Sequence, residues 1–428
     1  PVLAHNLRAF FLGKPLREHR PQKRFLSLLS LGERRATADK GPFSASGAWV
    51  WRWKDRIDRT FMDGFEDLPP RMDVEPAERL PELPPEPQMV CGGCGAKDGA
   101  DPLGSVLRDL ALAYPGHCTG GADDAAPLPA GAGGPLLQSL DVLREIVSDP
   151  WRMGRIAALH ALSDLYACGA RPVAALAAVT LPFAGARILH RDLFQLLAGA
   201  LFEFEQADCQ LAGGHSMQGG ELSLGFAVTG VPLDASGKIL EKTGARAGDA
   251  LVLTAPLGTG TLFAAHMRGL ANGQDVEAAV GHMLASNAEA ARLAVAHGAS
   301  ACTDITGFGL LGHLLEMLGD DLGARLQLAQ IPALAGAPEQ LLAGIFSTMH
   351  PANVEAGEAH LQLAQGADPA PAQLLYDPQT CGGLLVALPA GRARELCATL
   401  AAAGYGAAAV IGEVTGLPED GASRVLLA

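Results

Sequence analysis

The stretch Thr303-Asp304-Ile305-Thr306-Gly307-Phe308-Gly309-Leu310-Leu311-Gly312-His313 joins the end of a strand, a turn with glycines and the start of a helix. Such strand-to-helix turns are typical of domains that alternate strands with helices. The N-terminus of the following helix favours anions, and the carboxylate of Asp304 could complete a metal site. An ordinary helix N-cap would explain Asp304 equally well.

The same alternation extends over residues 90–428, which predicts an α/β (α+β) protein. A polar stretch at 235–248 interrupts the alternation, so we predict two domains, 90–240 and 241–428. Strands are predicted over 136–140, 173–181, 222–230, 250–254 and 384–388, and helices over 152–168, 188–207, 259–269, 276–297 and 310–319.

Charge is unevenly distributed along the chain. The whole chain carries a formal net charge of −14, whereas residues 1–70 hold 13 Lys/Arg and 8 Asp/Glu. The acidic total argues against nonspecific nucleic-acid binding, and no apolar run reaches the roughly 18–20 residues that span a bilayer. Prolines and acidic residues fill 71–89. We therefore predict a separate N-terminal unit, 1–70, and a proline-rich linker, 71–89.

The eight cysteines are scattered, and several interrupt apolar runs. This pattern predicts buried thiols in a reducing cytoplasm and not a disulfide framework. The CxxC pair, Cys91 and Cys94, lacks the second ligand pair that structural zinc requires. A redox pair fits better, but it leaves Lys97 unexplained.

The segment Cys91-Gly92-Gly93-Cys94-Gly95-Ala96-Lys97 holds a thiol three residues before a lysine. A nearby cationic amine lowers the pKa of a thiol and makes it a nucleophile. A lysine on a glycine-rich loop is also suited to contact phosphate. The sequence therefore predicts a nucleophile, Cys94, beside a phosphate-binding lysine, Lys97.

Carboxylates that suit Mg²⁺ occur at three further places. Gly120-Gly121-Ala122-Asp123-Asp124 offers two adjacent carboxylates among small residues, although a simple turn explains it as well. Asp141 follows a predicted strand and could face a site or cap a helix. Asp164 lies beside the apolar face of a predicted helix, where it needs a metal or an ion pair with Arg152 or Arg155.

Two glycine-rich turns complete the inventory. Gly213-Gly214-His215 follows a strand pattern and could offer backbone N–H groups to phosphate, with His215 as a phosphate contact or a plain loop residue. Asp377–Gly383 reads as a structural turn before a strand, with Cys381 buried and inert. Carboxylates and glycine turns together indicate Mg²⁺–nucleotide chemistry. Neither a Walker A pattern nor a kinase motif set is present, which indicates another nucleotide-binding fold.

With these motifs in this order, residues 91–428 resemble the selenophosphate synthetase (selenide, water dikinase) family. The resemblance implies the two-domain ATP-binding fold shared with aminoimidazole ribonucleotide synthetase, and a homodimer formed through the N-terminal domain sheet. It also implies conversion of ATP, selenide and water to selenophosphate, AMP and phosphate in the cytoplasm, for selenocysteine and selenouridine synthesis. The motifs that carry it are Gly93–Lys97, Asp123–Ala126, Asp141, Gly154–Ala158, Ser163-Asp164, Gly213–Ser216, Thr303–His313 and Asp377–Leu385.

The resemblance assigns roles to individual residues. Cys94 takes the position of the catalytic cysteine and Lys97 that of the essential lysine. The Mg²⁺ ligands match Asp124, Asp164 and Asp304. The positions that contact ATP match Lys97, Gly121, Ala122, Asp123, Asp141, Asp164, Gly213, Gly214 and His215. The departures are Ala96 in place of a second cysteine of some members, an extra Cys91, and Cys381 in place of a serine; neither cysteine change is expected to abolish activity.

Residues 1–70 resemble the C-terminal end of an FAD-dependent, NADH-dehydrogenase-like oxidoreductase, on the stretches Pro1–Arg8 and Lys54–Phe65. The glycine-rich dinucleotide fingerprint is missing and the chain lacks an initiator methionine. We interpret this unit as a remnant of a fused domain whose upstream part is absent, so FAD would bind only with that part present.

Two other functions stay open on the residues alone. Another enzyme of the same fold, such as aminoimidazole ribonucleotide synthetase or thiamine monophosphate kinase, would not need Cys94 and Lys97. A flavin-dependent oxidoreductase, in which residues 91–428 only regulate or dock, predicts FAD absorbance and NADH turnover.

Overall fold

The chain divides into two compact units, Pro1–Glu86 and Pro87–Ala428. The predicted linker, 71–89, lies outside the residues that the structure describes. No helix within the described part of the chain is long and apolar enough to cross a membrane. The structure, a computed structural model, describes residues 6, 9, 14–18, 25–66, 125–131, 134–234, 237–364, 369–417 and 423–428.

The first unit is an antiparallel three-stranded sheet with one helix packed on it. Strand β1 pairs with β2, and β2 pairs with β3. Helix α2 follows β3 directly, and its Val50 packs against Ala36 and Ala38 of β2. The bounds are β1 Ser27–Gly32, β2 Arg35–Lys40, β3 Phe43–Gly47 and α2 Ala48–Glu66.

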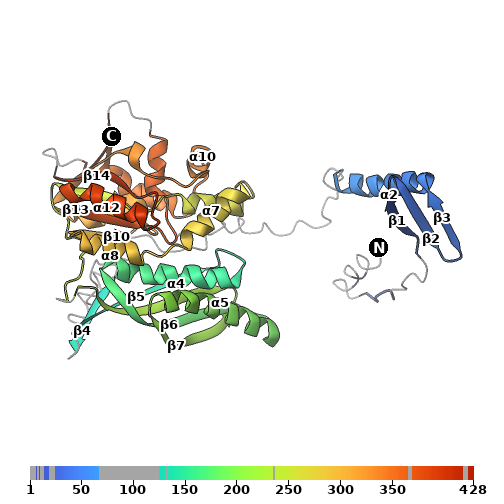
Figure 1. Ribbon diagram of the computed structural model, residues 1–428, viewed down its shortest axis with the longest axis horizontal. Helices are drawn as coiled ribbons and strands as arrows, with labels where there is room; N and C mark the ends of the chain where they lie inside the picture. Colours follow the sequence, from blue (N-terminus) through green and yellow to red (C-terminus); the bar gives the residue numbers. More distant parts are fainter. Residues whose placement is uncertain are drawn as a thin grey trace. The chain divides into compact units, whose positions relative to one another are not determined.

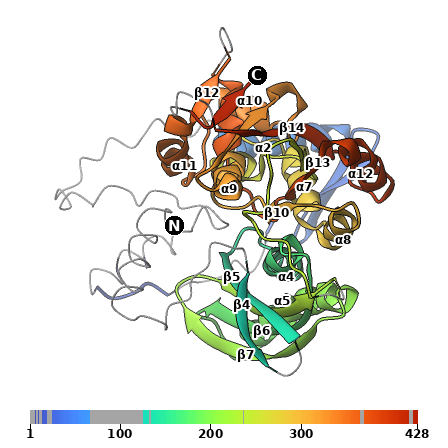
Figure 2. The same cartoon turned by 90° about the vertical axis from the view of Figure 1, so that its left-hand side faces the viewer.

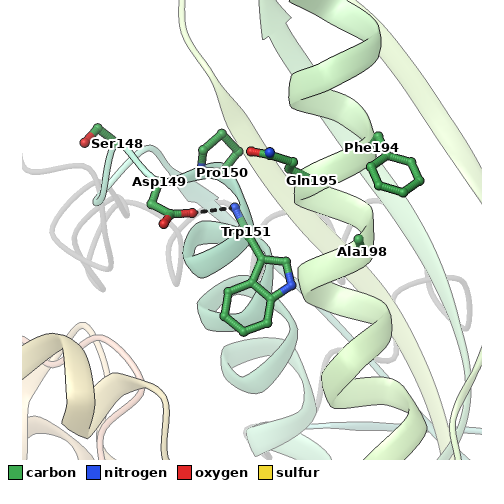
Figure 3. Close-up of a pocket in the computed structure, with 7 residues that line it drawn as sticks. All are labelled: Ser148, Asp149, Pro150, Trp151, Phe194, Gln195 and Ala198. Carbon is green, nitrogen blue, oxygen red and sulfur yellow. Dashed lines mark hydrogen bonds between the residues drawn. The ribbon is translucent and has the colours of Figure 1, made fainter.

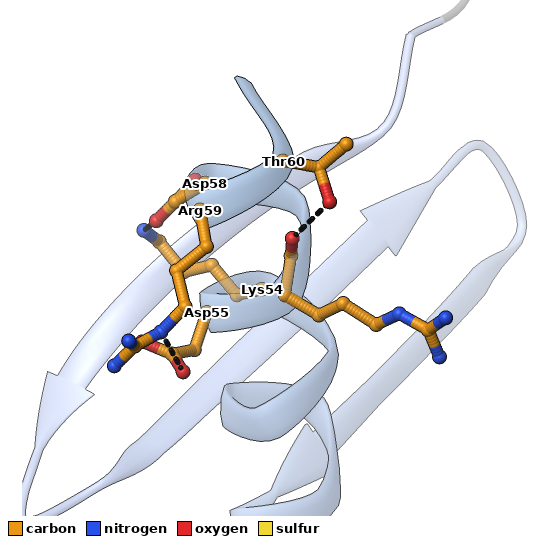
Figure 4. Close-up of polar contacts among 6 residues, drawn as sticks. Lys54, Asp55, Asp58, Arg59 and Thr60 are labelled. Atoms are coloured by element: carbon orange, nitrogen blue, oxygen red, sulfur yellow. Dashed lines mark hydrogen bonds and ion pairs between the residues drawn. The ribbon is translucent and has the colours of Figure 1, made fainter. Parts of the chain in front are cut away.

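Ion pairs between side chains four residues apart lie along α2 (Figure 4). Lys54 pairs with Asp58, and Arg59 Nε lies 2.9 Å from Asp55 Oδ2. Exposed pairs of this kind contribute little to stability because water screens them. The apolar contacts of Val50 therefore hold this helix to its sheet.

The second unit begins with a five-stranded sheet in the order β4-β5-β8-β6-β7. Neighbouring strands are antiparallel except β6 and β7, which are parallel. Helix α4 packs against β5, β6 and β8, and α5 packs against α4 and β7, so the helices cover one face of the sheet (Figure 1). The bounds are β4 Ala126–Gly131, β5 Gly134–Arg144, α4 Pro150–Ala167, β6 Ala170–Pro182, α5 Ala186–Gln206, β7 Gln210–Gly219 and β8 Ser223–Pro232.

Two glycines allow α4 and α5 to cross at close range. A Cβ atom on Gly154 of α4 would lie 1.9 Å from the Leu196 carbonyl oxygen, and one on Gly199 of α5 would lie 2.0 Å from the Trp151 carbonyl oxygen. Any larger side chain would force the backbones apart. The close packing explains why the motif Gly154–Ala158 begins with glycine.

The rest of the second unit is a seven-stranded sheet in the order β10-β13-β9-β14-β11-β15-β12. Its pairs are antiparallel except β11–β15 and β15–β12. The strands are β9 Asp249–Leu253, β10 Ala301–Asp304, β11 Leu322–Leu326, β12 Leu361–Leu363, β13 Leu384–Pro389, β14 Ala409–Gly416 and β15 Val425–Leu427. The helices are α6 Thr259–Met267, α7 Gly273–Met283, α8 Ala288–Ala296, α9 Gly309–Leu318, α10 Ala337–Leu342, α11 His350–Gly357 and α12 Ala390–Ala402.

Helix α4 links the two sheets. It contacts β10 and α8 of the second sheet's layers as well as its own sheet (Figure 2). One continuous apolar core contains Leu162 and Leu165 of α4 together with Val252 and Val386 of the second sheet. The other face of the second sheet builds a separate core with α9.

Three local expectations differ from the structure. The helix predicted over 276–297 is two helices, α7 and α8, because the Ser286 hydroxyl accepts a hydrogen bond from Ala288 N and begins a new helix. Asp141 lies inside β5 and not at a strand end, because β5 stays paired with β8 as far as Arg144. Gly213-Gly214-His215 lies inside β7 and does not form a loop.

Candidate active site

Part of the predicted site lies outside the described residues. The segment with the predicted nucleophile and lysine and the adjacent carboxylate segment are both in the range 67–124. The site residues concerned are Cys94, Lys97, Gly121, Ala122, Asp123 and Asp124. The described half consists of Asp141, Asp164, Asp304 and the Gly213–His215 strand.

Asp141 and Asp164 are held side by side between β5 and α4. His160 Nε2 lies 3.5 Å from Asp141 Oδ2, and the Ser139 hydroxyl donates to Asp164 Oδ2. Asp141 and His160 are buried. Ser139 and Asp141 are two residues apart on a strand, and His160 and Asp164 are four residues apart on a helix. Both spacings advance about 6–7 Å, so the two contacts can form at the same time. The carboxylates are therefore fixed by both elements.

The alternative ion pair for Asp164 is wrong. Arg152 pairs with Glu277 at 2.8 Å, and Arg155 pairs with the buried Glu203. The Arg155 guanidinium is also stacked on Trp151, 4.9 Å from the ring centre. Both arginines therefore pair with other carboxylates and not with Asp164.

Asp304 is the last residue of β10 and is only 1% exposed. It is not a helix N-cap, because α9 begins at Gly309 and its N-cap residue is Phe308. The elements that carry Asp164 and Asp304, α4 and β10, lie in contact. Carboxylate oxygens are the ligands that Mg²⁺ prefers, so this donor set fits the ion, with Asp124 outside the described residues. Among the described residues alone, no group of three potential ligands is assembled.

A buried polar chain begins two residues beyond Asp304. The Thr306 hydroxyl lies 3.2 Å from His313 Nε2, and His313 Nδ1 lies 3.3 Å from Glu316 Oε2. The buried Lys242, from the segment between the two sheets, lies 3.0 Å from the same oxygen. Burial alone would raise the pKa of Glu316, but His313 and Lys242 lower it to about 2. This chain explains why the Thr303–His313 motif ends in histidine.

The Gly213–His215 strand is separate from these carboxylates. Strands β8 and β6 lie between β5 and β7, which places the two groups three strand spacings, about 14 Å, apart. The glycines line a cavity of about 340 Å³ between β7, β6 and α5, with Leu193 and Leu197 on its helical wall. The extended strand is not the nest that the sequence predicts, although its backbone remains accessible.

The Asp377–Gly383 segment is structural, as predicted. Gln379 Oε1 accepts hydrogen bonds from the backbone of Gly258 and Thr259 at the start of α6. Burial raises the pKa of the fully enclosed Asp377 to about 7. Cys381 is buried, and its thiol donates to the Ile156 carbonyl of α4 at 3.3 Å.

A further hollow of about 670 Å³ lies where α4 begins (Figure 3). Asp149 caps α4 by accepting hydrogen bonds from the backbone of Trp151 and Arg152. The rings of Trp151 and Phe194 form the apolar walls of the hollow. None of the predicted site residues within the described part of the chain lines this hollow.

Sequence reasoning missed two residues that the structure brings to the site. His160 interrupts the apolar face of α4, and that interruption was the available signal. The sequence indicates Asn287 only as the N-cap of a helix. Its hydrogen-bond partners are distant in sequence and leave no local pattern.

Comparison with known proteins identifies both sheets. Residues 122–232 match the N-terminal domain, and residues 246–423 the C-terminal domain, of AIR synthase related proteins. The chain is 38% identical over 340 residues to a selenide, water dikinase of Burkholderia ambifaria, covering 78% of this chain and 94% of that protein. It is 37% identical over 350 residues to that of Myxococcus xanthus, covering 80% and 96%.

Solved structures support the same fold. Thiamine monophosphate kinase from Aquifex aeolicus is 18% identical with a TM-score of 0.52, covering 76% of this chain and 96% of that one. Hydrogenase maturation protein HypE in complex with ATP is 20% identical with a TM-score of 0.51, covering 76% and 90%. At these identities the likeness concerns the fold alone, which is the predicted two-domain α/β fold.

Proposed function

The chain belongs to the selenide, water dikinase family, and on that premise we propose that residues 91–428 convert ATP, selenide and water to selenophosphate, AMP and phosphate. The chain is accordingly a phosphotransferase that uses ATP. The observation that carries this function is the identity shared with curated selenide, water dikinases along nearly their whole length.

We assign Mg²⁺ to Asp124, Asp164 and Asp304. The contact of α4 with β10 and the burial of Asp304 support this set. Mg²⁺ bound there would neutralise charge on the polyphosphate of ATP. The hydroxyl of Ser139 holds the Asp164 carboxylate in one orientation, so the ligand need not be ordered when the metal arrives.

We assign the chemistry to Cys94 and Lys97. Lys97 would offset the charge that develops on the transferring phosphoryl group, and its amine would lower the pKa of the Cys94 thiol. As a thiolate, Cys94 would take up the proton of hydrogen selenide, so that selenium attacks the phosphoryl group without a change of oxidation state. Closure of the surrounding glycine-rich segment would exclude water from the first phosphoryl transfer.

Nucleotide contacts are assigned to two separate groups. Asp141 and Asp164 form the first, and Gly213, Gly214 and His215 form the second. The remaining assigned contacts lie outside the described residues: Lys97, Gly121, Ala122 and Asp123. Because about 14 Å separates β5 from β7, ATP must either span this distance or lie between two protomers.

We propose a homodimer formed through the first sheet of the second unit. The face of this sheet opposite α4 exposes large apolar side chains on β5, β6 and β7, with Leu140 62% exposed, Leu176 49% and Met217 57%. Exposed large apolar side chains gathered on one face favour an interaction site. A second copy of the same sheet is the partner that symmetry favours.

The first unit we assign to a fused oxidoreductase remnant. Its small core, built around Ala36, Ala38 and Val50, supports a role as part of a larger domain. Cys168 and Cys302 are buried, which fits the reducing cytoplasm.

The decisive experiment is a product assay on the full chain. With ATP, Mg²⁺ and selenide under reducing, anaerobic conditions, we expect AMP by chromatography and selenophosphate by phosphorus NMR. ADP as the final nucleotide product, or phosphorylation of thiamine monophosphate in place of selenide consumption, would instead assign another enzyme of the same fold. FAD absorbance with NADH turnover would assign an oxidoreductase.

A further inference from the structure

The side chain of Asn287 does not do what its position predicts. Asn287 is the N-cap residue of α8, where asparagine ordinarily accepts a hydrogen bond from a backbone N–H of the first turn. Asn272 does so at the start of α7, accepting from Gln274 N at 2.9 Å. Asn287 makes no such bond, and the neighbouring hydroxyl of Ser286 accepts from Ala288 N instead.

The Asn287 amide instead bridges the two halves of the second unit. Its Nδ2 donates to the Ser163 hydroxyl of α4 at 2.9 Å and to the Gly382 carbonyl at 2.8 Å. Asn287 is only 9% exposed. Both donors of a buried amide are thus spent on partners from different parts of the fold, where an unmade bond costs the full desolvation of the group.

Each end of this bridge leads to a carboxylate of the proposed metal site. Ser163 directly precedes Asp164 in α4. On the other side, Gly382 is followed by Gly383. The Gly383 carbonyl accepts a hydrogen bond at 2.9 Å from the backbone N–H of Ile305, the residue after Asp304. Among the described residues, one path from Asp164 to Asp304 therefore runs through the side chains of Ser163 and Asn287.

The loop that receives the second hydrogen bond is packed too tightly to move by itself. A Cβ atom on Gly382 would lie 2.0 Å from the Ile305 carbonyl oxygen, so only glycine fits beside the end of β10. The adjacent Cys381 thiol donates to Ile156 of α4. A shift of this loop would therefore move the end of β10, and Asp304 with it.

We propose that Asn287 is a positioning residue that holds Asp164 and Asp304, from the two halves of the second unit, at the separation required to bind one Mg²⁺. This role rests on the proposed metal site. Mg²⁺ demands nearly ideal octahedral geometry at about 2.0–2.1 Å, so a small relative shift of two ligands weakens binding. Residues that orient metal ligands change metal affinity about 10–100-fold when removed, and we expect about tenfold here because Asn287 acts through the backbone.

The test uses the metal alone as a probe, with Mn²⁺ in place of Mg²⁺ and binding followed by electron paramagnetic resonance on the full chain. Asn287→Ala is expected to weaken Mn²⁺ binding about tenfold, with metal-free ATP binding unchanged. Asn272→Ala is the matched control: it removes a genuine N-cap, lowers helix stability, and is expected to keep wild-type Mn²⁺ affinity. Ser163→Ala removes only the α4 half of the bridge and is expected to weaken Mn²⁺ binding in the same direction.

Wild-type Mn²⁺ affinity in Asn287→Ala, with a lowered melting temperature, would show that the bridge serves stability only and would overturn the proposal. Should Asn287→Ala not fold, Ser163→Ala decides by the same comparison. Asp164→Asn and Asp304→Asn report on the premise: if neither changes Mn²⁺ binding, the metal site itself is misassigned. That outcome is distinguishable from failure of the bridge, in which these two variants lose the metal and the Asn287 variant does not.

Discussion

Alanine is expected to destabilise the fold at Gly154 and to stabilise it at Gly281, although both glycines lie within helices. A Cβ atom on Gly154 would lie 1.9 Å from Leu196 O, where ordinary contacts begin at 3.4 Å. Helices α4 and α5 must therefore separate by up to about 1.5 Å to admit it. In α7, by contrast, a Cβ atom on the exposed Gly281 would meet nothing within 4 Å.

The magnitude follows from two opposing effects. Overpacking of this kind costs about 1–3 kcal/mol, because close-packed interiors relax only in part. Alanine restores about 1 kcal/mol of helix propensity relative to glycine. Because the overlap at Gly154 is with backbone, its cost lies at the upper end of that range, about 2–3 kcal/mol. Gly154→Ala should therefore lose on the order of 1–2 kcal/mol of unfolding free energy, whereas Gly281→Ala should gain up to about 1 kcal/mol.

Urea and thermal unfolding followed by circular dichroism would measure both. For a domain of this size, about 1 kcal/mol shifts the melting temperature by about 2–4 °C, so the two variants should move in opposite directions from the wild type. Gly199→Ala, on the other side of the same crossing, should behave like Gly154→Ala. The reasoning is refuted if Gly154→Ala is as stable as the wild type, or if Gly154→Ala and Gly281→Ala shift together.

Three further predictions concern activity, assembly and pH. Cys94→Ser and Lys97→Ala should each abolish selenide-dependent AMP formation while calorimetry still detects ATP binding; normal turnover of the lysine variant would remove Lys97 from the mechanism. Leu176→Lys, on the exposed face of the five-stranded sheet, should yield monomers in light scattering, whereas Leu270→Lys, which changes another exposed leucine, should not. A dimer in both variants would exclude that face as the dimer interface. Burial raises the folded-state pKa of Asp377 to about 7, so the folded state holds this proton where the unfolded state has lost it, and stability falls as pH rises from about 4 to 7. Asp377→Asn should flatten this slope in urea titrations at several pH values, and an unchanged slope would contradict the titration of Asp377.

Local apolar periodicity was sufficient to predict several helices and strands. The pattern over 152–168 corresponds to α4, Pro150–Ala167, and the strand predicted over 250–254 corresponds to β9, Asp249–Leu253. These elements are recognised from their own residues because each turns one apolar face towards a core. The ends of β5 and β7 were missed because pairing with β8 and β6, and not local composition, decides where those strands stop.

Residue types indicated the candidate ligands, but not how they are supported. Asp164 and Asp304 were recognisable as carboxylates in suitable settings. The bridge between them was not, because Asn287 and Ser163 are 124 positions apart in the sequence. The same holds for Asp141 and His160, which meet only after β5 and α4 have packed.

These contacts make α4 the element on which the described half of the site depends. Successive turns of this helix meet different partners: Gly154 admits α5, the Ile156 carbonyl accepts from Cys381, and His160 faces Asp141. Its last turns carry Ser163 and Asp164, which meet Asn287 and Ser139. A helix constrained on so many sides cannot shift at one contact without disturbing the others. A substitution at the α5 crossing should therefore alter metal affinity as well as stability. If the unfolding free energy falls from the wild type through Gly199→Ala to Gly154→Ala, the metal affinity should fall in the same order.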